Sequence, residues 1–316
     1  MQHEGLTARR RRSAEQLHKV TDAFSASTFL DDLPISVFCA GSLARQEIGD
    51  HSDLDIFVTA DRDVRLESRL CEYTLFAEVI NINNKELQLP EFSNDGQFLK
   101  ICFVDDLMRL TGAPTDDSEN IFTTRMLLLL ESVPVLHPDI YQKHLKAIAD
   151  HYYRDDRGKR TFRPLFLVND LLRYWRTLCL NYEERRHDKT KKWRKKNVNL
   201  KFSRMVTVFG TVLPVTAQLT NTSDELVQLC RRPALERLAA AVDHLDDHDL
   251  ARRWPEILDL YEEFLGWKEE EDVDKYLGDG SAKHRVREHA ETLSLFLHDA
   301  LTHARIRPEL RRYLIL

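Results

Sequence analysis

The sequence lacks any apolar run that approaches the roughly 18 residues of a membrane-spanning helix, so no membrane partner is expected. It also lacks an excess of positive charge, because 52 acidic residues outnumber 46 basic ones and give a formal net charge of -6. The field of the whole protein therefore does not attract nucleic acid, and binding of RNA or DNA requires a local basic patch.

Cysteine is scarce, with five residues that are far apart and odd in number. Such a pattern excludes a disulfide framework and predicts buried thiols of a reducing cytoplasm. The N-terminal basic run Arg9–Arg12 is followed by a pattern typical of an amphipathic helix and lacks an apolar export segment, which also favours the cytoplasm. The five cysteines are Cys39, Cys71, Cys102, Cys179 and Cys230.

The length of the chain and the change in its hydrophobic periodicity indicate two domains. The 316 residues include 42% hydrophobic residues, enough to bury a substantial core, and show no internal repeat. Strand patterns at 35–40, 54–59 and 98–104 alternate with helical patterns in the first third, and from Glu119 onward the spacing predicts almost only helix. A small domain with a sheet, followed by a larger helical one, is therefore expected.

The most informative stretch contains two carboxylates one residue apart. Asp53 and Asp55 enter the apolar run of the predicted strand 54–59, where alternation places both on one face and turns Leu54 into the core. Two adjacent carboxylates repel each other unless a cation lies between them, and oxygen ligands suit Mg²⁺ or Mn²⁺. The sequence therefore predicts a divalent metal site held by Asp53 and Asp55.

A tight turn precedes this pair. The predicted strand 35–40 leads directly into Gly41 and Ser42, with a short helix beginning near Ser42. Backbone N–H groups and a hydroxyl in such a turn can bind a phosphate. Gly41 and Ser42 are therefore candidate nucleotide-binding residues.

The string G-S-x(10)-D-x-D, with Arg45 and Glu47 inside it, resembles the DNA polymerase beta-like nucleotidyltransferase superfamily, in particular the bacterial branch of the PII uridylyltransferase. The resemblance covers about residues 33 to 60. It implies an α+β fold, with a small mixed-sheet nucleotidyltransferase domain over 1–115 and a larger all-helical domain over 116–316. It also implies that Arg45 joins the nucleotide-binding residues.

The activity that the resemblance implies is Mg²⁺- or Mn²⁺-dependent transfer of a nucleoside monophosphate from ATP or UTP to an acceptor hydroxyl, with release of pyrophosphate. A third carboxylate on a neighbouring strand usually completes the site. Asp95 is the preferred candidate, although Asn-Asp-Gly also favours a turn. Asp105 follows the predicted strand 98–104, where helix capping or a first-turn charge explains it better than a place in the site. The unclear third acid favours an alternative function, a catalytically silent nucleotide-binding sensor or interaction protein.

A basic segment interrupts the helical part of the chain. Residues 185–204 contain ten lysines and arginines and one acidic residue. Lys201 and Arg204 lie three residues apart at a predicted helix start and can reach a triphosphate, while Trp193 can stack on a base. Three roles are therefore open for this segment: it binds the nucleotide, it binds an RNA or protein acceptor, or it is a solvated loop without a ligand.

Two helical segments carry further expectations. In the predicted helix 64–80, helical spacing places Leu66, Leu70, Tyr73 and Ala77 on one face. In the leucine-rich helix that begins at Ile121, Arg125 and Glu131 need partners, because charges among apolar side chains are costly when unpaired. Salt links between the two domains are the expected partners.

Overall fold

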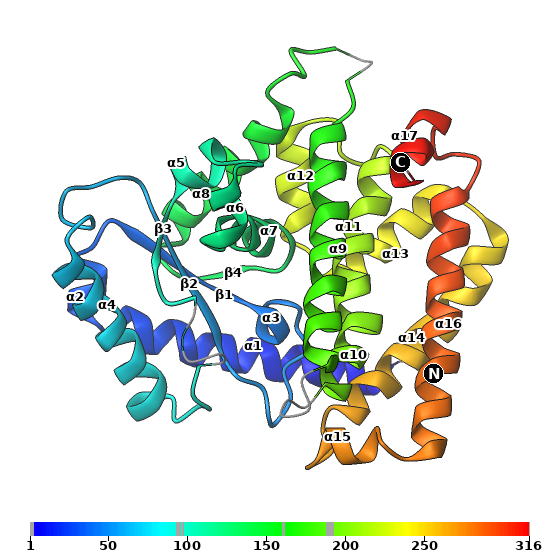
Figure 1. The fold of residues 1–316 in the computed structure, drawn as a ribbon, viewed down its shortest axis with the longest axis horizontal. Coiled ribbons are helices and arrows are strands. Elements are labelled where there is room, and N and C mark those ends of the chain that lie inside the picture. Colours follow the sequence, from blue (N-terminus) through cyan, green and yellow to red (C-terminus); the bar gives the residue numbers. More distant parts are fainter. Residues whose placement is uncertain (1–2, 93–95, 97, 160–161, 188–192, 316) are drawn as a thin grey trace. The chain divides into compact units, whose positions relative to one another are not determined.

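The computed structural model describes residues 3–92, 96, 98–159, 162–187 and 193–315. Contacts divide the chain into two compact units (Figure 1). We call Thr7–Arg154 the sheet unit, and Met1–Leu6 with Asp155–Leu316 the helical unit. The sheet unit thus extends well past residue 115, where the sequence places its domain boundary, and that boundary stays a prediction.

The sheet unit contains a four-stranded mixed sheet with strand order β3-β2-β1-β4. β1 pairs antiparallel with β2 and β4, whereas β2 and β3 are parallel. The expectation of a small mixed sheet followed by helices is therefore confirmed. The strands are β1 (Ile35–Ala40), β2 (Asp55–Ala60), β3 (Ile101–Phe103) and β4 (Val133–Leu136).

Strand β4 corrects the expectation that residues after Glu119 are almost entirely helical. It is short, contains Pro134, and occupies an edge of the sheet, which is where proline is tolerated because it cannot donate a ladder hydrogen bond. The pairing with β1 shifts register between Val37 and Phe38, beside Pro134. Contact with a distant strand, rather than local periodicity, makes this segment extended.

Helices cover both faces of the sheet (Figure 1). All six residues of β1 are buried, which explains its continuous apolar sequence. Val37 and Val58 belong to the core cluster that includes residues of α1 and α4, whereas Phe38 stacks on Phe57 at 5.3 Å and contacts Tyr141 of α8. The helices are α1 (Glu4–Ser25), α2 (Thr28–Asp31), α3 (Gly41–Ala44), α4 (Arg69–Asn81), the π-helical η1 (Ile82–Glu86), α5 (Val104–Arg109), α6 (Pro114–Ser118), α7 (Ile121–Leu130) and α8 (Pro138–Tyr153).

The helix expected over residues 64–80 forms as α4, but its buried face differs from the expected one. Leu70 and Tyr73 are 76% and 59% exposed. The helix is apolar at several spacings, so periodicity alone does not decide which side faces the sheet. The side chains that enter the core are Leu75, Phe76 and Val79.

Every element in the described part of the helical unit is a helix. Its core includes Phe202 stacked on Phe264 at 4.8 Å, and Gly210 lets α11 approach α13 so closely that a Cβ there would lie 2.8 Å from the Ala234 carbonyl oxygen. No helix in the described ranges is long and apolar enough to cross a membrane. The elements are α9 (Leu165–His187), α10 (Arg194–Asn199), the π-helical η3 (Leu200–Arg204), α11 (Met205–Thr216), α12 (Ser223–Cys230), α13 (Ala234–Leu245), α14 (His248–Trp267), α15 (Val273–Tyr276), α16 (Gly280–Thr302) and α17 (Pro308–Ile315).

Candidate active site

The turn after β1 and the start of β2 lie at the same end of the sheet. The antiparallel register pairs Ala40, the last residue of β1, with Asp55, the first of β2. Leu54 is 2% exposed, as the sequence predicts, and Asp53 and Asp55 on either side of it are half-buried. The fold therefore places the two carboxylates next to the Gly41 turn, with access to solvent.

Gly41 makes this approach possible. Its φ of +70° lies in the left-handed region that side chains with a Cβ rarely adopt. A Cβ at this position would lie 2.2 Å from Oδ2 of Asp55, far inside van der Waals contact. The carboxylate thus occupies the space that any other residue at position 41 would fill, and the motif requires glycine for both reasons.

Arg45 packs on the buried side of this turn. Its guanidinium is buried and pairs with Glu47, at 2.9 Å from Nε to Oε2, and with Glu131 at the end of α7. Backbone hydrogen bonds from Arg45 N to Gly41 O (3.0 Å) and from Glu47 N to Ser42 O (2.8 Å) close the turn. These contacts position Arg45 against the turn, and the nucleotide contact that the resemblance implies for Arg45 stays a prediction.

Two polar side chains of the motif have no side-chain partner in the part of the chain that the structure describes. Within the described residues, the Ser42 hydroxyl and the Asp53 carboxylate form no side-chain hydrogen bond or ion pair, and both side chains are partly exposed. The neighbouring Cys39 thiol differs, because burial and the Asp55 carboxylate raise its pKa well above the usual value. Cys39 is therefore a neutral core residue, while Ser42 and Asp53 are available to a ligand.

The carboxylates suit a hard divalent cation in charge and donor type. Together with the other described side chains, however, they do not form a complete set of metal ligands. Among the described residues, the only three His, Cys, Asp or Glu side chains with ligand atoms all within 4.8 Å of one another are His3, Asp259 and Glu262 of the helical unit. Asp53 and Asp55 thus fit a metal that also takes oxygens from a substrate or water.

The two candidates for the third carboxylate differ in position. Asp95 lies outside the described residues. Asp105 is exposed in the first turn of α5, directly after β3. Because β3 runs parallel to β2, with Phe103 beside Ala60, Asp105 lies at the end of the sheet opposite Asp55. The N-cap of α5 is Phe103, without a side-chain cap hydrogen bond, so Asp105 fits the role of a negative charge in the first turn of the helix.

A small cavity adjoins Asp55 on the side of β3. It is lined by Asp55, Phe92, Gly96, Phe98 and neighbouring residues of β2. Extending the parallel register of β2 and β3 pairs Asp55 with Phe98. The segment just before β3 therefore approaches the carboxylates, whereas the segment after it does not.

Lys201 and Arg204 belong to the helical unit, where both lie half-buried in the π-helical turn η3. Burial, and then the charge of Arg287, lower the pKa of Lys201. Trp193 contacts Tyr182, with ring centroids 6.4 Å apart, and the Arg194 guanidinium. Residues 188–192 of the basic segment are outside the described residues.

The buried charges of α7 find their partners inside the sheet unit. Arg125 donates to both oxygens of Asp116, at 2.9 and 3.0 Å, and to the hydroxyl of Tyr152 at 3.0 Å. Glu131 accepts from Arg45. The pair of Glu131 with Arg45 links the two domains by the bounds predicted from the sequence, 1–115 and 116–316, whereas all five residues lie within one contact unit, Thr7–Arg154.

Comparison of the chain with protein-family models and with curated proteins finds no match. The structure brings Gly41 against Asp55 and leaves Ser42 and Asp53 without partners among the described residues. Glu47, two residues after Arg45, was a local signal for the inward pairing of Arg45, whereas its second partner Glu131 is 86 residues away and gave none.

Proposed function

We propose that this protein is a Mg²⁺- or Mn²⁺-dependent nucleotidyltransferase that transfers a nucleoside monophosphate from ATP or UTP to an acceptor hydroxyl. The observation that carries the proposal is the close approach of the Asp55 carboxylate to Gly41, where a Cβ would lie 2.2 Å from Asp55 Oδ2, in a turn of positive φ. A phosphate-binding turn and a metal-binding carboxylate must lie this close to act on one nucleotide.

In this proposal Asp53 and Asp55 hold the metal, which when bound neutralises phosphate charge and orients the phosphates. The backbone N–H groups after Gly41 and the Ser42 hydroxyl bind the outer phosphates. The acceptor oxygen forms a bond to the α-phosphorus, the bond to the bridging oxygen breaks, and pyrophosphate leaves. Asp95, the candidate third carboxylate, accepts the proton of the acceptor hydroxyl.

A second candidate function has its own support. No third carboxylate in the described residues completes a cluster with Asp53 and Asp55. A protein that binds the nucleotide without transferring it, as a sensor or interaction protein, needs only the turn and the metal pair. The two functions make the same prediction for nucleotide binding and opposite predictions for transfer.

The test uses ATP and UTP labelled at the α-phosphorus, with Mg²⁺ or Mn²⁺, and protein and tRNA fractions as acceptors. The transferase predicts label on an acceptor with the wild-type chain, and loss of label with Asp55→Asn and Asp95→Asn. Nucleotide binding without transfer to any fraction supports the silent sensor. Failure to bind either nucleotide contradicts both.

The basic residues of the helical unit are proposed as further contacts. Lys201 and Arg204 hold the triphosphate, and the earlier lysines of the segment, Lys191, Lys192, Lys195 and Lys196, bind an RNA or protein acceptor. Lys201→Gln and Arg204→Gln are then expected to weaken triphosphate binding about threefold to tenfold each, and Lys283→Gln, an exposed lysine of α16, to leave it unchanged. Equal affinity in all three variants would remove Lys201 and Arg204 from the site.

Cysteine chemistry supports a cytoplasmic location as part of the proposal. All five cysteines are free thiols, and Cys39, Cys102 and Cys230 are buried. Burial raises the pKa of Cys230 to about 11, so this thiol is protonated and unreactive at neutral pH. Unpaired thiols are typical of proteins in a reducing compartment.

A further inference from the structure

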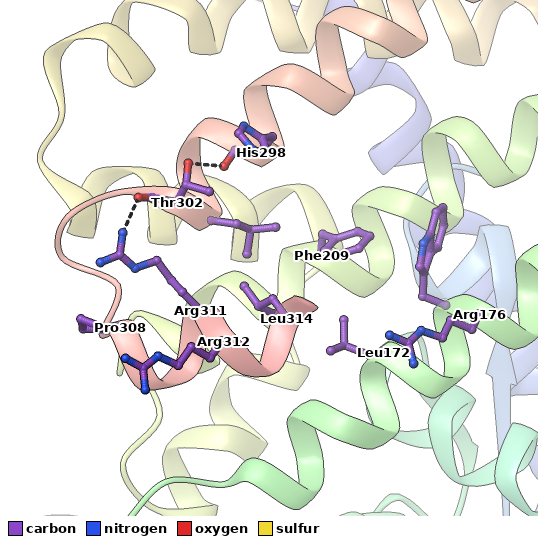
Figure 2. A pocket seen from close by; sticks show the side chains of 11 residues that line it. Leu172, Arg176, Phe209, His298, Thr302, Pro308, Arg311, Arg312 and Leu314 are labelled. Atoms are coloured by element: carbon purple, nitrogen blue, oxygen red, sulfur yellow. Dashed lines mark hydrogen bonds between the residues drawn. The ribbon is translucent and has the colours of Figure 1, made fainter. Parts of the chain in front are cut away.

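The helical unit contains a cavity of about 600 Å³ between α9, α11, α16 and α17 (Figure 2). This volume lies within the range of about 300–1,000 Å³ typical of small-molecule sites. All of its lining residues lie within the helical unit, so the cavity does not depend on the sheet unit. They are Leu172, Trp175, Arg176, Phe209, His298, Leu301, Thr302, Pro308, Arg311, Arg312 and Leu314.

The floor of the cavity is apolar and partly aromatic. Trp175 meets Phe209 edge to face, with ring centroids 5.4 Å apart. Leu172, Leu301 and Leu314 complete the apolar part of the lining. Such a surface favours an alkyl chain or a ring over water.

The charge of the lining is opposite to that of the protein. Three arginines and one histidine contribute to it, and no acidic residue does, although the chain carries a net charge of -6. Arg311 donates to the Thr302 carbonyl at 3.1 Å. Arg176 forms no hydrogen bond or ion pair with a described residue. Figure 2 shows the Arg176 side chain extending toward Leu172, whereas the Arg312 side chain points away from the other lining residues.

We propose that this cavity binds a small amphipathic anion, a carboxylate or phosphate with an apolar chain or ring, whose head meets Arg176. A nucleotide fits less well. Apart from the arginines, the polar groups of the lining are the Trp175 indole N–H, the His298 ring and Thr302, whose hydroxyl already donates to the His298 carbonyl at 2.8 Å. A base and ribose together would therefore replace only part of their hydrogen bonds to water, which is costly. The site is independent of the proposed nucleotidyltransferase activity.

The test is calorimetric titration of the full chain with decanoate and with decyl phosphate, both below their micelle-forming concentrations. Decanol supplies the same chain without charge, and decyltrimethylammonium supplies the opposite charge. We expect saturable binding with one site for the anions and weaker binding of both controls. Tighter binding of decyl phosphate identifies a phosphate head as the natural one, and tighter binding of decanoate identifies a carboxylate. Equal binding of the cation would overturn the proposal.

Two arginines of the same cavity form a matched pair of variants. Arg176→Gln is expected to weaken decanoate binding about threefold to tenfold and to leave decanol binding unchanged. Arg312→Gln is expected to change either affinity less than about twofold, because its guanidinium points outward. Circular dichroism checks that both variants fold. Unchanged decanoate affinity in folded Arg176→Gln, or equal losses in the two variants, would contradict the assignment.

Location is tested separately by Trp175, which lines the cavity. Decanoate is expected to change the tryptophan fluorescence of the wild-type chain. Most of that change should be absent in Trp175→Phe, while calorimetry still records binding. Asp55→Asn should bind decanoate as tightly as the wild-type chain, so failure of the proposed enzymatic function leaves this test unaffected. Displacement of decanoate by metal-free ATP would instead make the cavity a nucleotide site and overturn the proposal.

Discussion

Two carboxylates of the sheet unit, Asp116 and Asp55, have contrasting surroundings. Asp116 is fully buried, and the guanidinium of Arg125 satisfies both of its oxygens. Asp55 is half-buried against Gly41, and a second carboxylate, Asp53, precedes it by one residue. A buried charge with an internal partner maintains the fold. Carboxylates placed side by side with access to solvent repel each other, and a cation relieves that repulsion.

The largest effect on stability is expected at the buried pair. Arg125→Met leaves Asp116 buried without its counter-charge and should lower the free energy of unfolding by about 3–5 kcal/mol, measured by urea denaturation. The double variant Arg125→Met with Asp116→Leu should recover most of this loss. Arg62→Gln, which breaks the exposed pair with Asp106, serves as the control and should cost far less. Equal losses at the two sites would contradict the comparison.

Gly41→Ala is expected to have the next largest effect. The left-handed backbone alone should cost about 1–2 kcal/mol, and the new Cβ must also displace Asp55. Gly112→Ala is a matched control, because Gly112 has a φ of +77° and nothing within 4 Å of its Cβ position. Both variants should lose stability, but only Gly41→Ala should lose nucleotide affinity. Equal affinities in the two would separate Gly41 from the nucleotide site.

A smaller effect concerns pH. Burial lowers the pKa of His144, whose Nδ1 lies 3.0 Å from Thr59 Oγ1, with Asp61 and Lys143 acting in opposite directions. The folded state therefore favours neutral His144, so its contribution to stability is complete above the unfolded pKa of ~6.5 and is lost as the pH falls through the folded pKa.

His144→Gln should thus reduce the loss of unfolding free energy between neutral and mildly acidic pH, measured by urea denaturation at both. His18→Gln is the control, since His18 is exposed in α1. A pH dependence that is the same in both variants would show that His144 is not the group responsible. In that case the contrast between buried groups and the partly exposed Asp55 would include Asp116 but not His144.

Local patterns predicted the strands around the motif well. The strand over 35–40 forms within those bounds, and the one expected over 54–59 forms one residue later. Both carry apolar runs bounded by polar residues, so the sequence alone contains the signal. Two features could not be read locally. The edge strand β4 depends on pairing with β1, and the buried face of α4 depends on which of its apolar sides meets the sheet.

The candidate site was predictable to the extent that it is local. Gly41, Ser42, Asp53 and Asp55 lie within one short segment, and the register of two adjacent strands brings them together. Arg45 lies in the same segment, but Glu131, which pairs with it, is 86 residues away. Spacing alone cannot reveal such a partner. The positive φ of Gly41 and its contact with Asp55 likewise required the three-dimensional fold.

The most direct test of the central claim measures Mn²⁺ binding in the presence of ATP or UTP by electron paramagnetic resonance. The wild-type chain is compared with Asp53→Asn, Asp55→Asn and, as control, Asp105→Asn at the opposite end of the sheet. We expect Asp53→Asn and Asp55→Asn to weaken metal–nucleotide binding at least about tenfold, with thermal stability equal or slightly higher because repulsion is relieved, and Asp105→Asn to bind normally. Wild-type affinity in folded Asp53→Asn and Asp55→Asn would contradict the account.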